Sequence, residues 1–163
     1  MEPEPKAPEE LVELALTGLW RARKRHALAR LSERRGERTG PHATLPDAVF
    51  ELLDVVEAAD TAPTVTEVAG ELAVDQPRAS RLVAQALNAG LLRREADQRD
   101  GRRSLLTLTE DGVDVLATVR GFRRRVISEA TAGWPSPDRE ALAELLTRFV
   151  RDYARVTALR EHR

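Results

Sequence analysis

The stretch from Ala73 to Leu92, AVDQPRASRLVAQALNAGLL, predicts a short helix with a marked start and a marked end. Asp75 is the expected N-cap, and Pro77 falls in the first turn, where a missing backbone N–H costs little because that group has no partner in the helix. Gly90 is expected just past the last turn. Between these ends, one apolar stripe recurs at three- and four-residue steps and comprises Ala79, Leu82, Val83, Ala86 and Leu87.

The segment before this helix predicts a second, shorter helix. Thr64 and Glu67 fit a capping box, in which the hydroxyl and the carboxylate each accept a hydrogen bond from a backbone N–H at the helix start. The apolar stripe of this helix is formed by Val65, Val68, Ala69 and Leu72. Only Ala73 and Val74 separate the two helices, which is the spacing typical of a helix-turn-helix.

After Gly90 the pattern changes to that of strands. Residues 91–96 and 104–109 are predicted strands, and the second alternates through Leu106 and Leu108. The polar turn 97–103 between them contains Gly101. A hairpin directly after a helix-turn-helix predicts a winged helix-turn-helix, so the expected fold class is mainly α with a small β-hairpin wing.

Length and charge bound the possible functions. The 163 residues carry a net charge of −1, but the segment from Gln76 to Leu106 holds seven arginines against three acidic residues, a local balance of +4. A basic segment within a nearly neutral chain is typical of a protein that meets phosphates with a single face. The sequence has no cysteine, which excludes disulfides, thiolate zinc sites and cysteine redox sensing.

The sequence also argues against a membrane protein, a metal site and an enzyme. No apolar run approaches the ~18 residues of a membrane span, and the N-terminus is acidic and proline-rich, unlike a signal peptide, so we expect a soluble, cytoplasmic protein. The three histidines, at positions 26, 42 and 162, lack metal-ligand spacing. No phosphate-binding loop, nucleophile elbow or His-Glu-x-x-His motif is present, so we expect no catalysis and no cofactor.

Several short motifs resemble those of the MarR family of bacterial transcriptional regulators. The wing signature D-x-R-D-x-R is present from Asp97 to Arg102, and the Ser-Arg-Leu-Val of the recognition helix spans Ser80 to Val83. Gly90-Leu91 and Leu108-Thr109 match the start of the hairpin and of the helix that follows it. The chain departs from the family at Arg78-Ala79, which bears on base preference and not on the fold. The resemblance implies a homodimer that binds double-stranded DNA.

Eight residues are predicted to meet the DNA. The recognition helix and the wing supply Gln76, Arg78, Ser80, Arg81, Arg99, Asp100, Arg102 and Arg103. An arginine that reaches a guanine edge in the major groove discriminates bases by ~1–3 kcal/mol. Arg102 is expected to enter the minor groove, with Asp100 orienting its guanidinium. The alternatives are solvated side chains and, for Asp100 and Arg102, an exposed salt bridge worth ~0–1 kcal/mol.

The rest of the chain is expected to be helical. A long helix is predicted from Pro8 to about residue 34, and further helices after caps at Thr44, Thr109 and Ser136. The connection 58–63 has room for a residue or two to pair at the base of the wing. The expected organisation is a flexible tail at 1–7, an N-terminal dimerisation helix and loop at 8–43, a winged helix-turn-helix DNA-binding domain at 44–109, and C-terminal dimerisation helices at 110–163.

The first helix and the last two carry wide apolar stripes outside the winged-helix core. Burying one such side chain contributes ~1.5–3 kcal/mol, so these stripes need a cover. The expected cover is the same helices of a second copy, because most oligomers of this kind are two-fold. A dimer places two recognition helices ~34 Å apart and predicts an inverted-repeat operator.

Members of the family that this chain resembles commonly bind small aromatic or phenolic acids, which implies an effector site. The candidate residues are Trp20, Arg23, His26, Phe50 and Phe122. For the aromatic residues and His26 the alternative is ordinary core packing, and for Arg23 it is a solvated basic helix face. The predicted function is a repressor that a small-molecule effector releases from DNA. An effector-independent DNA binder, an activator, and a winged-helix module that binds another protein are the alternatives.

Overall fold

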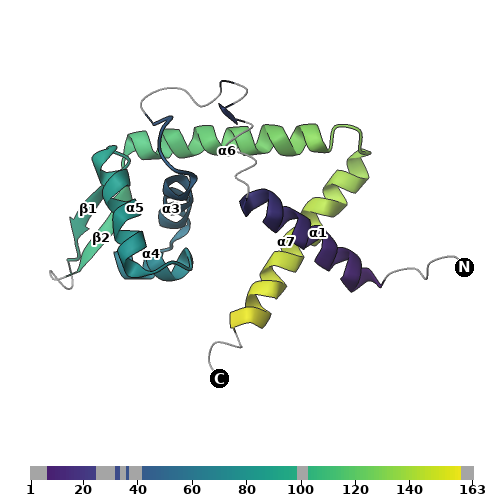
Figure 1. Cartoon of the computed structure of the whole chain (residues 1–163), viewed down its shortest axis with the longest axis horizontal. Coiled ribbons are helices and arrows are strands. Elements are labelled where there is room, and N and C mark those ends of the chain that lie inside the picture. Colours follow the sequence, from purple (N-terminus) through teal and green to yellow (C-terminus); the bar gives the residue numbers. More distant parts are fainter. Residues whose placement is uncertain (1–6, 25–31, 34–35, 37–41, 99–102, 159–163) are drawn as a thin grey trace, which may run out of the picture. The chain divides into compact units, whose positions relative to one another are not determined.

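The computed structural model of the chain describes residues 7–24, 32–33, 36, 42–98 and 103–158. The chain divides into two compact units, residues 1–122 and 123–163. Figure 1 shows the helices and strands, in the order α1 (Pro8–Lys24), α3 (Asp47–Ala58), α4 (Val65–Glu71), α5 (Gln76–Asn88), β1 (Leu92–Ala96), β2 (Ser104–Leu108), α6 (Glu110–Ala130) and α7 (Ser136–Ala158). None of these helices is both long and apolar enough to cross a membrane.

The core of the first unit lies between α3, α4, α5 and the hairpin, which are grouped together in Figure 1. Its completely buried side chains include Leu52 and Leu53 from α3, Val68 from α4, Val83 from α5 and Leu106 from β2. Leu116 of α6 joins the same cluster. Val68, Val83 and Leu106 occupy inward positions of the predicted apolar patterns, so the predicted winged helix is confirmed.

Both caps of the helix-turn-helix form as predicted. The Asp75 carboxylate accepts a hydrogen bond from the backbone N–H of Arg78 at 2.7 Å. Thr64 and Glu67 form the reciprocal capping box at the start of α4. Between the helices Ala73 adopts φ 51°, a left-handed conformation that is uncommon for a residue with a Cβ and that makes the turn tight. The turn thereby brings α4 against α5.

The wing is a two-stranded antiparallel sheet in which Leu92 pairs with Leu108 and Ala96 with Ser104. A third segment joins it at the middle of β2, because the Leu106 N–H donates a hydrogen bond to the Pro63 carbonyl at 2.8 Å. The predicted pairing of the connection 58–63 with the wing is therefore confirmed. This bond ties the residue before the α4 cap directly to β2.

The start of α6 lies close to the end of α5. Gly90 has φ 73°, as expected for the residue that ends a helix, and its carbonyl accepts a hydrogen bond from the Thr109 hydroxyl at 2.6 Å. The same hydroxyl accepts from the Gly112 N–H at 3.0 Å and so caps α6, as predicted. A Cβ on Gly112 would lie 2.1 Å from the Leu91 carbonyl oxygen, so only glycine permits this approach.

Two predicted helix starts are wrong in detail. Helix α3 begins at Asp47 with Pro46 as its N-cap and no side-chain cap, so Thr44 does not cap it. The reason is steric, since a residue before proline avoids the helical region and Leu45 cannot join the helix. Helix α7 begins at Ser136 itself, and the Pro135 carbonyl accepts from the N–H groups of the first turn. The predicted continuation of the first helix beyond Lys24 lies largely outside the described residues.

Helices α1 and α7 each expose large apolar side chains, which are between 39% and 64% accessible in the single chain. On α1 these are Leu11, Val12, Leu14, Leu19 and Trp20. On α7 they are Leu142, Leu145, Leu146, Val150, Tyr153 and Val156. The predicted apolar stripes therefore exist, and within the single chain they are largely uncovered.

Candidate nucleic-acid interface

Helix α5 has one buried and one exposed face. Its buried residues are Ala79, Leu82, Val83 and Ala86, which belong to the predicted stripe. Its exposed residues include Gln76, Arg78, Ser80, Arg81 and Gln85. The polar side chains gather toward the N-terminal half, so this end of the helix offers hydrogen-bond donors to a partner outside the protein.

The structure separates the roles of these polar side chains. The Arg81 Nε–H donates to the Pro77 carbonyl at 3.3 Å, which turns the guanidinium toward the start of the helix. Gln76 donates from Nε2 to the Thr66 hydroxyl at 3.3 Å and so connects α5 to α4. This contact gives Gln76 a structural role in addition to the DNA contact predicted for it. Arg78 and Ser80 are exposed beside Arg81.

On the outer face of the wing, acidic and hydroxyl groups accompany the basic side chains. The Arg93 Nε–H donates to Glu95 at 2.8 Å, and the Thr107 hydroxyl donates to the same carboxylate oxygen at 3.2 Å. These hydrogen bonds, from Arg93 first and Thr107 second, lower the pKa of Glu95 below its usual value. Arg94 donates to the Ser104 hydroxyl at 3.3 Å across the hairpin.

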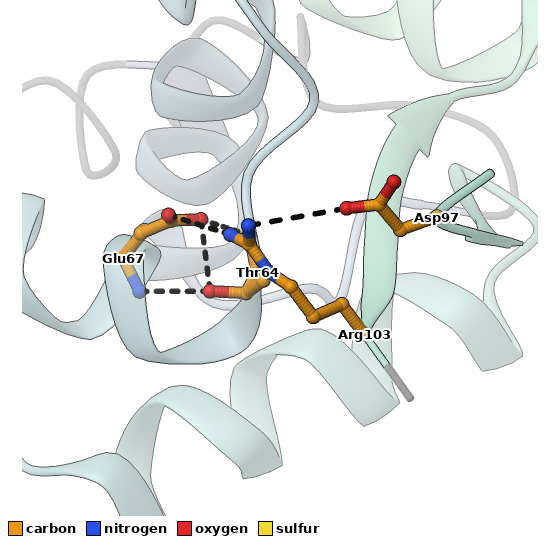
Figure 2. A network of polar contacts seen from close by, with 4 residues as sticks. All are labelled: Thr64, Glu67, Asp97 and Arg103. Carbon is orange, nitrogen blue, oxygen red and sulfur yellow. Dashed lines mark hydrogen bonds and ion pairs between the residues drawn. The ribbon is translucent and has the colours of Figure 1, made fainter. Parts of the chain in front are cut away.

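At the turn end of the wing, just before β2, Arg103 belongs to a network that reaches α4 (Figure 2). Its Nη2 donates to Glu67 Oε1 at 3.0 Å, and its Nη1 lies 3.9 Å from Asp97 Oδ2. The other Glu67 oxygen accepts from the Thr64 N–H at 2.7 Å and from the Thr64 hydroxyl at 2.9 Å. Hydrogen bonds from Thr64, together with Arg103, lower the pKa of Glu67 below its usual value. Arg103 is therefore already paired within the protein.

The other predicted wing contacts, Arg99, Asp100 and Arg102, lie outside the described residues. Sequence reasoning missed the partner of Arg103, because Glu67 is 36 residues away in the chain and nothing local marks the pair. The described residues contain no group of three or more acidic or histidine side chains that could hold a metal ion.

The predicted effector residues differ in environment. Phe50 is only 6% exposed and belongs to the hydrophobic core, and Phe122 is buried on α6. The place of Phe50 in the core cluster fits the core-packing alternative. Trp20 is 54% exposed on α1. His26 and the side chain of Arg23 lie outside the described part of the chain.

A second set of charges, which sequence reasoning also missed, connects α6 to α3. The Arg120 Nε–H donates to Asp54 Oδ1 at 3.0 Å, the Arg120 Nη2 lies 3.0 Å from the same oxygen, and the guanidinium also forms an ion pair with Glu57. The partners are more than 60 residues apart in the chain. This cluster holds the middle of α6 to the core helix α3.

Comparison with known proteins also indicates a winged-helix fold. Residues 43–103 match the model of the MarR family. RV1404 from Mycobacterium tuberculosis is similar over 92% of this chain and 97% of its own, with 21% identity and a TM-score of 0.69. A mutant of MarR from E. coli is similar over 91% and 99%, with 18% identity and a TM-score of 0.66.

MepR from S. aureus, in a structure with ethidium bromide bound, is similar over 84% of this chain and 95% of its own, with 17% identity and a TM-score of 0.57. No curated protein sequence matches the chain. MarR-family regulators are DNA-binding transcription factors and not enzymes. The winged-helix segment of this chain, residues 43–103, belongs to the MarR family, and the chain has the fold of solved MarR-family regulators.

Proposed function

We propose that this protein is a cytoplasmic transcriptional repressor that binds an inverted-repeat operator as a homodimer. Helix α5 enters the major groove and the wing reaches the adjacent minor groove. The observation that carries this proposal is the exposed face of α5, where Arg78, Ser80 and Arg81 stand opposite a buried stripe. That arrangement fits a helix whose N-terminal half contacts base edges while its other face packs on the protein.

The two arginines of α5 are suited to different contacts. The bond from Arg81 Nε to the Pro77 carbonyl orients the guanidinium, and the Nη groups are separate donors for a guanine edge or a phosphate. Arg78 lies in the first turn, next to the Asp75 cap. Ser80 is small enough to let the helix approach the duplex closely and can donate to a phosphate.

For the wing, the proposal rests on the sequence signature. Arg102 is proposed to enter the minor groove, where A·T-rich tracts concentrate negative potential, and Asp100 to orient it. Arg99 is proposed to contact the backbone phosphates beside it. These three residues extend the contact region beyond the major groove reached by α5.

The proposed dimer is supported by the uncovered apolar stripes of α1 and α7. Each large side chain removed from water contributes ~1.5–3 kcal/mol, so covering several of them favours association strongly. We propose that the cover is a second copy of this chain, because a two-fold pair presents two α5 helices to an operator with two half-sites.

Release from DNA is proposed to follow binding of a small aromatic compound. Support comes from the structurally similar MepR, which binds the aromatic cation ethidium. In this chain Trp20 exposes an aromatic ring on α1, and Arg23, His26 and Phe122 are the other candidates. Phe50 is left out of this set because it lies in the core.

The test begins with selection of genomic fragments bound by the full-length protein at low salt. With the selected operator, R81A and R78A are each expected to weaken binding and to lower the slope of affinity against salt concentration by about one. R139A, an exposed arginine at the start of α7, is the matched control and should leave the slope unchanged. The proposal fails if the wild-type protein selects no fragment.

A further inference from the structure

We propose that Glu67 and Arg103 are positioning residues that hold the wing in a fixed orientation relative to the recognition helix α5. We call this ion pair the wing clasp. The inference rests on the proposed DNA binding, and it assigns Arg103 a role other than the phosphate contact expected from the sequence. Figure 2 shows the Arg103 side chain reaching from the turn end of the wing to the first turn of α4.

The clasp is the second of two attachments between the second half of the hairpin, residues 103–108, and the segment 63–67 around the start of α4. The first is the hydrogen bond from the Leu106 N–H to the Pro63 carbonyl, 2.8 Å long. The second is the Arg103–Glu67 ion pair, 3.0 Å long. With the Leu106 bond alone the paired hairpin could rotate about that point, whereas a second attachment at Arg103, three residues nearer the turn, restricts this rotation. The pair therefore controls the angle of the wing.

Glu67 is prepared for this contact before Arg103 arrives. Its Oε2 is held by the N–H and the hydroxyl of Thr64, which leaves Oε1 facing Arg103. Exposed ion pairs are usually weak, in part because two long side chains must be ordered. Here the capping box has already ordered the carboxylate, so only the arginine loses conformational freedom.

The same turn of α4 holds the recognition helix. Thr66, next to Glu67, accepts the hydrogen bond from Gln76, the first residue of α5. Two consecutive α4 residues thus connect separately to α5 and to the wing. Because both connections start from one helical turn, α4 relates the positions of the two elements that are proposed to enter neighbouring grooves.

The proposal predicts an effect opposite to that of simple electrostatics. A carboxylate beside a DNA-binding surface repels phosphates, so its neutralisation should strengthen binding if charge alone matters. If Glu67 instead positions the wing, its neutralisation should weaken binding. The sign of the change in affinity therefore separates the two roles.

The experiment measures operator affinity of the full-length protein for E67Q, R103Q and the double variant. Glutamine keeps the size of Glu67 and is accepted at this position of a capping box, so the α4 cap is retained. E67Q and R103Q are each expected to weaken binding about threefold. The double variant should bind the operator at least as tightly as the single variant with the lower affinity. For all three variants the slope of affinity against salt concentration should equal that of the wild type.

E71Q is the matched control, because Glu71 is exposed at the other end of α4. Its neutralisation should leave operator affinity unchanged or raise it slightly. The wing clasp is refuted if E67Q binds as tightly as the wild type or more tightly. It is also refuted if R103Q lowers the salt slope by about one, because that result identifies Arg103 as a phosphate contact.

Hydrogen exchange without DNA tests the clasp apart from the proposed function. In E67Q the N–H groups of Leu106 and Asp97 should exchange faster, because the Leu106 bond to Pro63 attaches the wing to the chain before α4 and the Asp97 bond to Arg103 lies beside the clasp. The N–H of Val83, inside α5, should keep its wild-type rate. If the exchange rates of Leu106 and Asp97 are unchanged in E67Q, the inference is overturned. If instead the wild-type protein selects no operator from genomic fragments, only the proposed function is overturned.

Discussion

Glu67 takes part in two local structures, the cap of α4 and the ion pair with Arg103. Both stabilise the ionised form of Glu67, because the N–H and hydroxyl of Thr64 and the guanidinium of Arg103 all donate to the carboxylate. The pKa of Glu67 consequently lies below its ordinary value of 4.5. A group whose pKa is lower in the folded protein stabilises it above the unfolded pKa.

This shift predicts a pH-dependent difference between the wild type and E67Q. Near pH 7 the wild type should be the more stable, and the difference should shrink as the pH falls below 4.5 and Glu67 takes up a proton. Urea denaturation at several pH values measures the free energy of unfolding of both proteins. A difference that stays constant down to pH 3 would show that the ionised carboxylate has no special role.

Among the elements, α6 is held to the core at two places. Its first turn lies against the backbone of Leu91, where Gly112 allows the approach. About two turns beyond Gly112, Arg120 binds Asp54 and Glu57 of α3. The contacts involve backbone at one place and charged side chains at the other, so α6 is fixed along its first half by two independent interactions.

The approach at Gly112 makes an unusual prediction for a helix. Glycine to alanine usually stabilises a helix by roughly 0.5–1 kcal/mol, as we expect for G70A in α4, where a Cβ meets nothing within 4 Å. G112A should instead destabilise the protein by about 1–3 kcal/mol, because its Cβ would collide with the Leu91 carbonyl. Urea denaturation of both variants distinguishes the sites. A G112A protein as stable as the wild type would contradict the packing of α6 on the end of α5.

For the whole molecule, the main feature is the contrast between a closed core and two uncovered helices. Leu52, Leu53 and Leu106 are completely buried, whereas Leu146 and Val150 of α7 are about half exposed. The stripe on α7 has the three- and four-residue spacing of a packed helix face. A packed face without a partner in the single chain is the basis for proposing a second copy.

The proposed dimer predicts that L146E is monomeric. A carboxylate in the middle of a covered apolar face would lose its hydration without a partner, so association should be lost. T147E adds the same charge one residue along, off the stripe, and should stay dimeric. Sedimentation velocity of the wild type, L146E and T147E, all at the same micromolar concentration, measures their oligomeric states. Dimeric L146E, or a wild type that sediments as a monomer, would rule out this use of α7.

The sequence by itself determined the local structure of the winged helix. The capping residues Thr64, Asp75 and Thr109, the stop at Gly90 and the strand alternation in β2 all form as predicted. These features depend on hydrogen bonds and steric preferences among residues within about four positions, or on the period of apolar residues. The types and order of neighbouring residues are enough to specify them.

Only the tertiary structure decided which distant side chains meet. Neither the pairing of Arg103 with Glu67 nor the Arg120 cluster on α3 has a signal in the sequence, and the DNA contact predicted for Arg103 stays a prediction. The wrong prediction of a cap at Thr44 was different, because the residue before a proline avoids the helical region and this preference can be read from the sequence. Ion pairs between elements depend on which faces the packed core turns toward each other, and that arrangement is settled by burial of the whole apolar set and not by any short stretch of chain.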